Sequence, residues 1–115
     1  TECFKMNKAK FEYYVVLVTA PDIDVARNVA KAVLEQKKAA CANIVPQIES
    51  HYWWEGKLES SNEVLIVFKT TEKALHQLEH VVREEHPYDT PEIVCTEITR
   101  GNDRYLNWLS DSVNA

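Results

Sequence analysis

Apolar residues change their spacing several times along this chain, and each change marks an expected element. Residues 13–20 form an unbroken apolar run rich in β-branched side chains, which is typical of a strand buried on both faces. Asp22 follows it as a good N-cap. Between residues 23 and 38 the apolar positions recur at helical spacing. This spacing predicts a helix with Lys37 and Lys38 in its last turn, where the macrodipole favours cations.

A strand period returns at Cys41 and continues to Trp54, and a second strand leads back from there. Pro46 interrupts the first arm, which indicates an edge position or a bulge. Gly56 supplies the positive φ of the turn between the arms. Because Glu55 tolerates that region poorly, we expect a type I turn with a glycine bulge in preference to a type I′ turn. Each arm has roughly a dozen residues and spans ~40 Å, about twice the length of an ordinary strand.

The rest of the chain predicts three further elements. Residues 72–85 carry one apolar stripe at helical spacing, made by Leu75, Leu78, Val81 and Val82. A rigid two-proline loop occupies residues 86–91, residues 92–99 have the pattern of a fourth strand, and a short helix follows Gly101. The resulting order, β-α-β-β-α-β with a terminal helix, predicts an α+β, ferredoxin-like fold. In that fold a four-stranded antiparallel sheet carries both long helices on one face.

The overlong hairpin ends in large aromatic side chains, which are unusual at a position normally exposed to water. Tyr52, Trp53 and Trp54 directly precede the expected turn. An isolated two-stranded ribbon is barely stable in water, and exposed apolar rings indicate a surface that something else covers. We therefore predict a homo-oligomer in which these three residues form an interface; the symmetry does not follow from the hairpin alone.

Length and charge restrict the class of protein further. The 115 residues support one domain, which we place at residues 13–115 after an N-terminal extension of residues 1–12. The net charge of −5, from 18 acidic and 13 basic residues, argues against a nucleic-acid partner, because nucleic-acid binders usually carry a basic stripe. No apolar run approaches the ~20 residues that span a bilayer, so no membrane span is expected.

The cysteines and the first residues bear on the compartment. Cys3, Cys41 and Cys95 are dispersed and form no C-x-x-C pair, which favours reduced thiols in an intracellular setting. Residues 1–12 contain lysines but no apolar segment of a signal peptide. Because the chain begins with Thr1, it is compatible with earlier removal of a targeting segment. We expect a cytoplasmic protein, with the secretory pathway or the mitochondrion as alternatives.

The sequence carries no familiar signature of an enzyme. Two glycines in the whole chain exclude a P-loop, and no G-x-S-x-G elbow is present. Cys41 and His86 offer one imaginable nucleophile and base, but Cys41 lies among alanines, a setting typical of an inert packed cysteine. We therefore expect no catalytic site.

Candidate ligand-binding residues fall into three groups. His76 and His80 lie four apart on the expected helix, a spacing that can hold a metal ion, but they lie opposite the apolar stripe and a solvated pair is favoured. His86 and Glu92 flank the two-proline loop and make half of a metal site. The third group is a polar pocket between subunits, formed by Lys69 with Glu63, Trp54 and Tyr88. The alternative for Lys69, somewhat favoured, is that it snorkels at the strand end.

Several motifs in a fixed order resemble the CutA family of divalent-cation tolerance proteins. The matching segments are residues 18–22 (VTAPD), 40–43 (ACAN), 52–58 (YWWEGKL), 68–71 (FKTT) and 86–92 (HPYDTPE). The resemblance covers residues 13–109, which is nearly the whole chain. It implies a homotrimer of ferredoxin-like subunits, similar in assembly to the PII signalling proteins, with long hairpins in the subunit interfaces. It also implies links to copper and other divalent cations, and animal relatives are associated with acetylcholinesterase anchoring or processing in the secretory pathway.

The metal residues of the family carry over only in part. Bacterial relatives have a cysteine where this chain has Val18, and a histidine where it has Glu85. Of the constellation that the resemblance implies, Glu92 matches, with His86 as its neighbour and Cys41 as the usual cysteine of the family. A soft copper ion prefers thiolate and imidazole ligands, so these two departures weaken the expected copper site.

Two functions are therefore expected. The first is a CutA-like trimer that binds copper or another divalent cation through His86, Glu92 and Cys41, weakly or at subunit interfaces. The second is a non-enzymatic scaffold or PII-like signalling trimer. Its clefts between subunits, lined by Lys69, Glu63, Trp54 and Tyr88, take a small anion or a partner protein.

Overall fold

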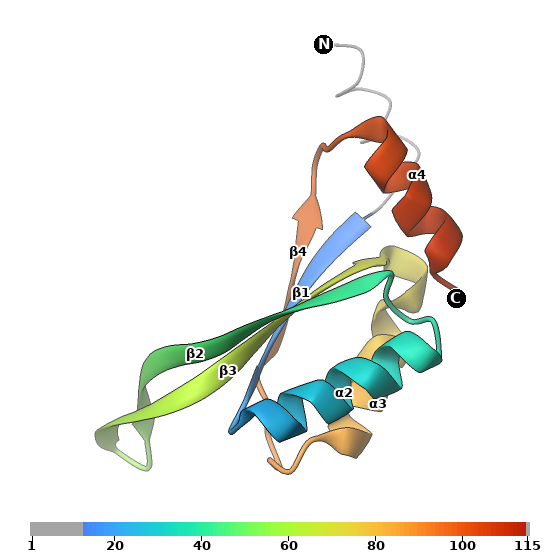
Figure 1. Ribbon diagram of the computed structural model, residues 1–115. Helices are drawn as coiled ribbons and strands as arrows, with labels where there is room; N and C mark the ends of the chain where they lie inside the picture. Colours follow the sequence, from blue (N-terminus) through green and yellow to red (C-terminus); the bar gives the residue numbers. More distant parts are fainter. Residues whose placement is uncertain (1–12, 115) are drawn as a thin grey trace.

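The computed structural model describes residues 13–114, which form a sheet flanked by helices (Figure 1). The elements are β1 (Tyr13–Ala20), α2 (Ile23–Glu35), β2 (Cys41–Trp54), β3 (Lys57–Thr71), the short 3₁₀ helix η1 (Glu72–Ala74), α3 (Leu75–Glu85), β4 (Ile93–Ile98) and α4 (Asp103–Ser112). The predicted β-α-β-β-α-β order with a terminal helix is confirmed. The N-terminal extension expected at residues 1–12 lies outside the described residues.

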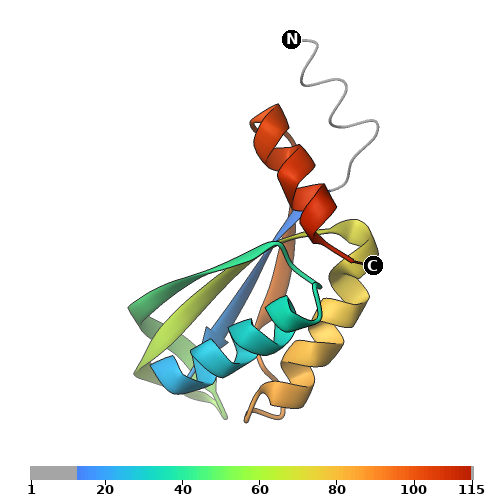
Figure 2. The same cartoon turned by 45° about the vertical axis from the view of Figure 1, so that its right-hand side comes forward.

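The four strands form one antiparallel sheet in the order β2-β3-β1-β4. β1 is central, as its unbroken apolar run indicates, while β2 and β4 are the two edges. Helices α2 and α3 lie side by side on one face of the sheet, as Figure 2 shows. Helix α4 lies at one end of the sheet, away from this pair (Figure 1).

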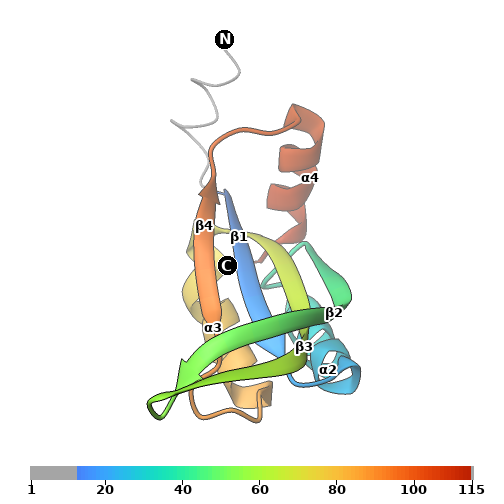
Figure 3. The same cartoon turned by 90° about the vertical axis from the view of Figure 1, so that its left-hand side faces the viewer.

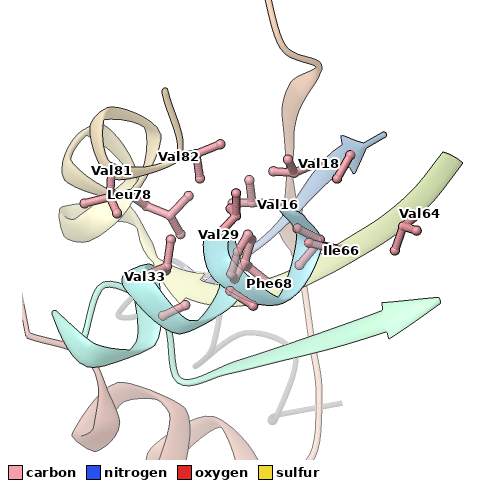
Figure 4. Packing of buried hydrophobic residues seen from close by; sticks show 14 residues of the cluster. Val16, Val18, Val29, Val33, Val64, Ile66, Phe68, Leu78, Val81 and Val82 are labelled. Carbon is pink, nitrogen blue, oxygen red and sulfur yellow. The ribbon is translucent and has the colours of Figure 1, made fainter. Parts of the chain in front are cut away.

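The main core lies between the sheet and these two helices. Alternate residues of β1 and β3 point toward the helices, because successive side chains of a strand point to opposite faces. The fully buried members shown in Figure 4 include Val16, Val18, Val29, Val33, Ile66, Phe68, Leu78 and Val82. The predicted stripe of α3 lies on this core, with Leu75 its only partly buried member.

Helix α2 ends at Glu35, three residues before the expected end. Lys37 adopts a left-handed φ of 57°, so Lys37 and Lys38 lie beyond the last turn and not within it. The Lys38 N–H donates to the Val33 carbonyl at 3.1 Å and the Lys37 N–H to the Leu34 carbonyl at 2.9 Å. This pair of bonds is a Schellman cap, with lysine in the position that glycine usually occupies.

The predicted long hairpin is present, with 14 residues in β2 and 15 in β3, and it extends well beyond the helices (Figure 1). Both predictions for Pro46 are confirmed, because β2 is an edge strand and its pairing with β3 shifts between Val45 and Ile48. The turn expectation was wrong. Trp54 pairs with Lys57 across a two-residue loop, and Glu55 (φ 50°) and Gly56 (φ 78°) both have positive φ, which defines a type I′ turn.

Helix α4 packs on a second, smaller cluster. Leu106 and Leu109 are buried there with Tyr13, the first residue of β1. The helix begins after Asn102, whose side-chain oxygen accepts a hydrogen bond from the Tyr105 N–H at 3.0 Å. The cluster joins the end of the chain to the start of the sheet.

The sheet face opposite α2 and α3 presents apolar side chains that nothing in the described chain packs over. The residues of this open face are Val15, Leu17, Val45, Leu65, Val67 and Val94, which share one side of the sheet through the pairings of β1 with β3 and β4 and of β3 with β2. None of these residues belongs to either buried cluster of residues 13–114, or packs against one. Figure 3 views the molecule with the strands in front of α2 and α3.

Candidate functional site

The bulge in β2 decides where the aromatic side chains of the hairpin point. Beyond the bulge, Tyr52 pairs with Glu59, Trp53 with Leu58 and Trp54 with Lys57. Directly paired residues of two strands share a face, and successive residues of one strand alternate between faces. Trp53 and Trp54 therefore point to opposite faces of the ribbon, the two-stranded part of the hairpin beyond the bulge (residues 48–63). Trp53 and Leu58 together form one apolar face, with 73% and 65% of their surfaces exposed.

The other face of the ribbon carries Tyr52 and Trp54 and continues the open face of the sheet. Glu63, from the same strand face, accepts a hydrogen bond from the Tyr88 hydroxyl at 3.3 Å. Burial and the nearby Glu63 carboxylate raise the pKa of Tyr88, so its phenol remains neutral and a donor. Tyr52 bonds through its hydroxyl to Ser61 at 3.3 Å. The bond between Tyr88 and Glu63 therefore joins the two-proline loop to the hairpin, while the bond between Tyr52 and Ser61 lies within the hairpin.

Lys69 lies apart from this group within one chain. It is six residues from Glu63 on β3, a separation of ~20 Å along a strand. Its ammonium group donates a hydrogen bond to the side-chain oxygen of Asn43 on β2. The expected cleft residues thus divide into two places: Lys69 at one end of the open face, and Glu63, Trp54 and Tyr88 toward the other.

His86 is the C-cap of α3, directly after Glu85, and is buried, with 7% of its surface exposed. Its Nε2 lies 2.7 Å from the Thr19 carbonyl oxygen, and its Nδ1 accepts the Tyr88 N–H at 3.2 Å. Only the neutral ring protonated at Nε2 satisfies both partners. A metal ion at His86 has to replace one of these bonds. Glu92 is exposed, immediately before β4.

Cys41 lies at the opposite end of the sheet from His86. Cys41 pairs with Lys69, which pairs with Val15 of β1, whereas His86 bonds to Thr19, four residues and ~13 Å further along β1. In residues 13–114, no three histidine, cysteine or carboxylate side chains converge to hold a metal ion. The three expected metal residues are therefore not brought together in a single chain.

The thiol of Cys41 contacts α4, a partner that sequence reasoning did not identify. The Tyr105 hydroxyl lies 3.5 Å from the Cys41 sulfur. This hydrogen bond, reinforced by burial, raises the pKa of Tyr105 to about 12. Sequence reasoning likewise did not identify Asn43 as the partner of Lys69, or Thr19 as the partner of His86. No local signal marks such pairs, since their members are 26 to 67 residues apart.

Comparison with known proteins decides the family. The profile of the family described as "CutA1 divalent ion tolerance protein" matches residues 14–112. The chain belongs to this family. The CutA divalent-cation tolerance protein of Thermus thermophilus is 46% identical over 98 residues, which cover 85% of this chain and 95% of the relative. The crystal structure of CutA1 from Oryza sativa superposes with a TM-score of 0.88 at 42% identity, covering 90% of this chain and 95% of the other.

CutA relatives from plants are longer and carry a compartment in their names. The chloroplastic CutA protein of Arabidopsis thaliana is 45% identical over 98 residues, 85% of this chain. The chain spans about half of the length of this relative, 54%. None of the helices within residues 13–114 is both long enough and apolar enough to cross a membrane.

Proposed function

We propose that this CutA-family chain assembles into a homotrimer that binds divalent cations, with copper as the candidate ion, and that it has no catalytic activity. Membership of a family named for divalent ion tolerance supports the proposal that the chain binds a divalent cation. The open face of the sheet is the observation that carries the assembly. The thiol of Cys41 and the imidazole of His86 are ligand types that copper prefers.

The open face and the ribbon need a cover that the single chain does not provide. Val94 and Val45 expose 49% and 40% of their surfaces, and Trp53 and Trp54 expose more. β2 and β4 also leave their outer edges unpaired within residues 13–114. Two different edges on one chain favour a head-to-tail contact, which closes into a ring when the rotation between copies permits.

The cation site of this proposal draws on more than one subunit. His86 and Glu92 lie near one end of the sheet and Cys41 at the other, so one subunit alone does not bring them to a common ion. Contacts between subunits can place one end of the sheet beside the other end of the next copy.

The assembly and the cation are tested separately. Light scattering should give three times the chain mass of 13.3 kDa, independent of dilution. Calorimetric titration of Cu²⁺ into the metal-free protein should then show saturable binding that weakens in the Glu92→Gln and Cys41→Ser variants. A monomeric mass contradicts the assembly, and unchanged binding in both variants contradicts these ligands.

A second candidate function, a trimeric scaffold or PII-like signalling protein, is favoured by the surface around Tyr88. Tyr88, Tyr52 and Trp54 each expose at least 41% of their surfaces, and Glu63 lies among them. Aromatic side chains with a carboxylate suit a partner protein better than a small anion, because Lys69, the expected cation, is elsewhere. Loss of a partner in the Tyr52→Ser variant, with Lys69→Ala unaffected, supports this candidate; the reverse pattern favours an anion at Lys69.

A further inference from the structure

Helix α3 carries two histidines on its outer side that none of the sites above uses. His76 and His80 are both exposed, whereas Leu78, Val81 and Val82 of the same helix are buried in the core. The expectation that these histidines lie opposite the apolar stripe is therefore confirmed.

The two rings are neighbours on the helix surface. Residues four apart on a helix have Cβ atoms roughly 5–6 Å from each other, so two imidazoles at this spacing can reach one ion. Glu84 lies four residues after His80 on the same side of the helix. The His80 Nε2 is 3.5 Å from the Glu84 Oε2, and the two side chains are 70% and 62% exposed. His76, His80 and Glu84 thus form a row along one side of α3.

The charges around this row favour a cation. The last two turns of α3 carry Glu79, Glu84 and Glu85 against a single Arg83. Two of these carboxylates lie in the final turn, where the negative end of the helix macrodipole repels them. A bound divalent cation relieves that repulsion. Imidazole is a ligand suited to copper, nickel and zinc, while magnesium and calcium prefer oxygen.

We propose that His76 and His80 chelate one divalent transition-metal ion on the outer side of α3, with water completing its coordination. No third ligand converges on the pair in the described structure, so the ion is held by two imidazoles in an open and exchangeable site. The site lies on the helix layer, on the other side of the sheet from the open face. It therefore remains accessible in the proposed trimer, with one ion per chain.

The test uses Cu²⁺ alone, added to the full-length, metal-free protein. Paramagnetic broadening of amide NMR signals should centre on residues 76–84, and calorimetry gives the affinity. The His80→Gln variant should bind at this position at least about tenfold more weakly, since one of two linked ligands is lost. Both residues are exposed, so this change leaves the fold intact.

The matched control is a double variant, Gln77→His with His80→Gln, which keeps the number of histidines on α3 and breaks the spacing. Adjacent residues of a helix do not face each other, so this variant should bind as weakly as His80→Gln. Unchanged broadening of α3 in either variant overturns the proposal, as does the absence of broadening in the parent protein. The Glu92→Gln and Cys41→Ser variants should retain the α3 signal, which separates this site from the cation site of the proposed function.

Discussion

Glu55 at the hairpin tip is the residue whose backbone conformation fits its side chain least well. Its φ of 50° lies in the left-handed region, which costs a non-glycine L-residue about 1–2 kcal/mol. Asparagine tolerates this region better, and Asn-Gly is the preferred pair of a type I′ turn. Gly56 has open space where a Cβ would be, so its role is conformational and not steric.

The Glu55→Asn variant should therefore be more stable by about 0.5–1 kcal/mol, because the new side chain tolerates the left-handed region at lower cost. Chemical denaturation at a fixed protein concentration measures this difference. Lys57→Asn, one residue outside the two-residue loop, serves as the control and should not stabilise. Equal effects of the two variants contradict the argument from φ.

A second residue-scale effect concerns alkaline pH. The pKa of Tyr105 rises from 10.0 to about 12 in the folded chain, mainly through the hydrogen bond with Cys41. Between these pH values the folded chain keeps a proton that the unfolded chain has lost. The contribution of the protonated Tyr105 phenol to the stability of the fold is fully present below pH 10 and is lost as the pH rises toward 12.

In the Tyr105→Phe variant this loss of stability should be smaller, since no phenol titrates at that position. Unfolding free energies measured at several alkaline pH values test it, and Tyr52→Phe controls for the removal of one phenol. Parallel pH curves for Tyr105→Phe and the parent protein exclude the effect.

At the scale of elements, His86 joins three segments that are distant in the sequence. It caps the C-terminal end of α3, donates to the Thr19 carbonyl near the end of strand β1, and accepts a hydrogen bond from the Tyr88 N–H of the loop. Tyr88 in turn reaches Glu63 on the hairpin. The loop after α3 therefore has a fixed position relative to both β1 and β3.

The His86→Ala variant should lose about 2–3 kcal/mol of stability, because the Thr19 carbonyl loses its buried partner and a cavity remains. His51 is exposed, and its ring contacts the exposed Glu49 carboxylate within residues 13–114, so His51→Ala should change stability by less than about 0.5 kcal/mol. Thermal or chemical unfolding of the metal-free proteins compares the two. A loss in His86→Ala as small as in His51→Ala contradicts the role of the buried ring.

At the scale of the whole molecule, the two faces of the sheet have different covers. Helices α2 and α3 cover one face of the sheet, while Val45 and Val94 of the open face and the aromatic residues of the ribbon are exposed in the single chain. The extents of 48 × 29 × 22 Å reflect the hairpin that projects from the body. Uncovered apolar surface of this kind is typical of a face that another molecule covers, which supports the proposed assembly.

The Val94→Glu variant should shift the protein toward monomers, because a carboxylate on the open face must be buried without a partner when copies associate. Val94 is 49% exposed in the single chain, so the fold itself tolerates the change. Light scattering measures the mass, with Lys31→Glu on the outer side of α2 as the control. An unchanged mass in Val94→Glu removes the open face from the interface.

Sequence reasoning predicted the elements of the fold well and the sites only in part. β1 and β2 begin and end where the hydrophobic period places them, because that period is a local property of the backbone. The start of α2 after Asp22 was also predicted, but the end of α2 and the hairpin turn were missed, since Lys37 and Glu55 adopt positive φ against their own preference. The hydrogen bonds of the helix cap at Lys37, and the pairing of Trp54 with Lys57 around Glu55, override the local preference at these two positions.

The sequence by itself determined which residues belong to strands, helices and core, and its motifs identified the family. Only the tertiary structure decided which groups meet: Lys69 with Asn43, Cys41 with Tyr105, and His86 with Thr19. It also decided which tryptophan continues the open face: one extra residue in β2 reverses the alternation beyond the bulge, so that Trp54 lies on this face and Trp53 on the other. Such contacts depend on the register between strands far apart in the chain, and a change of one residue moves every side chain to the other face.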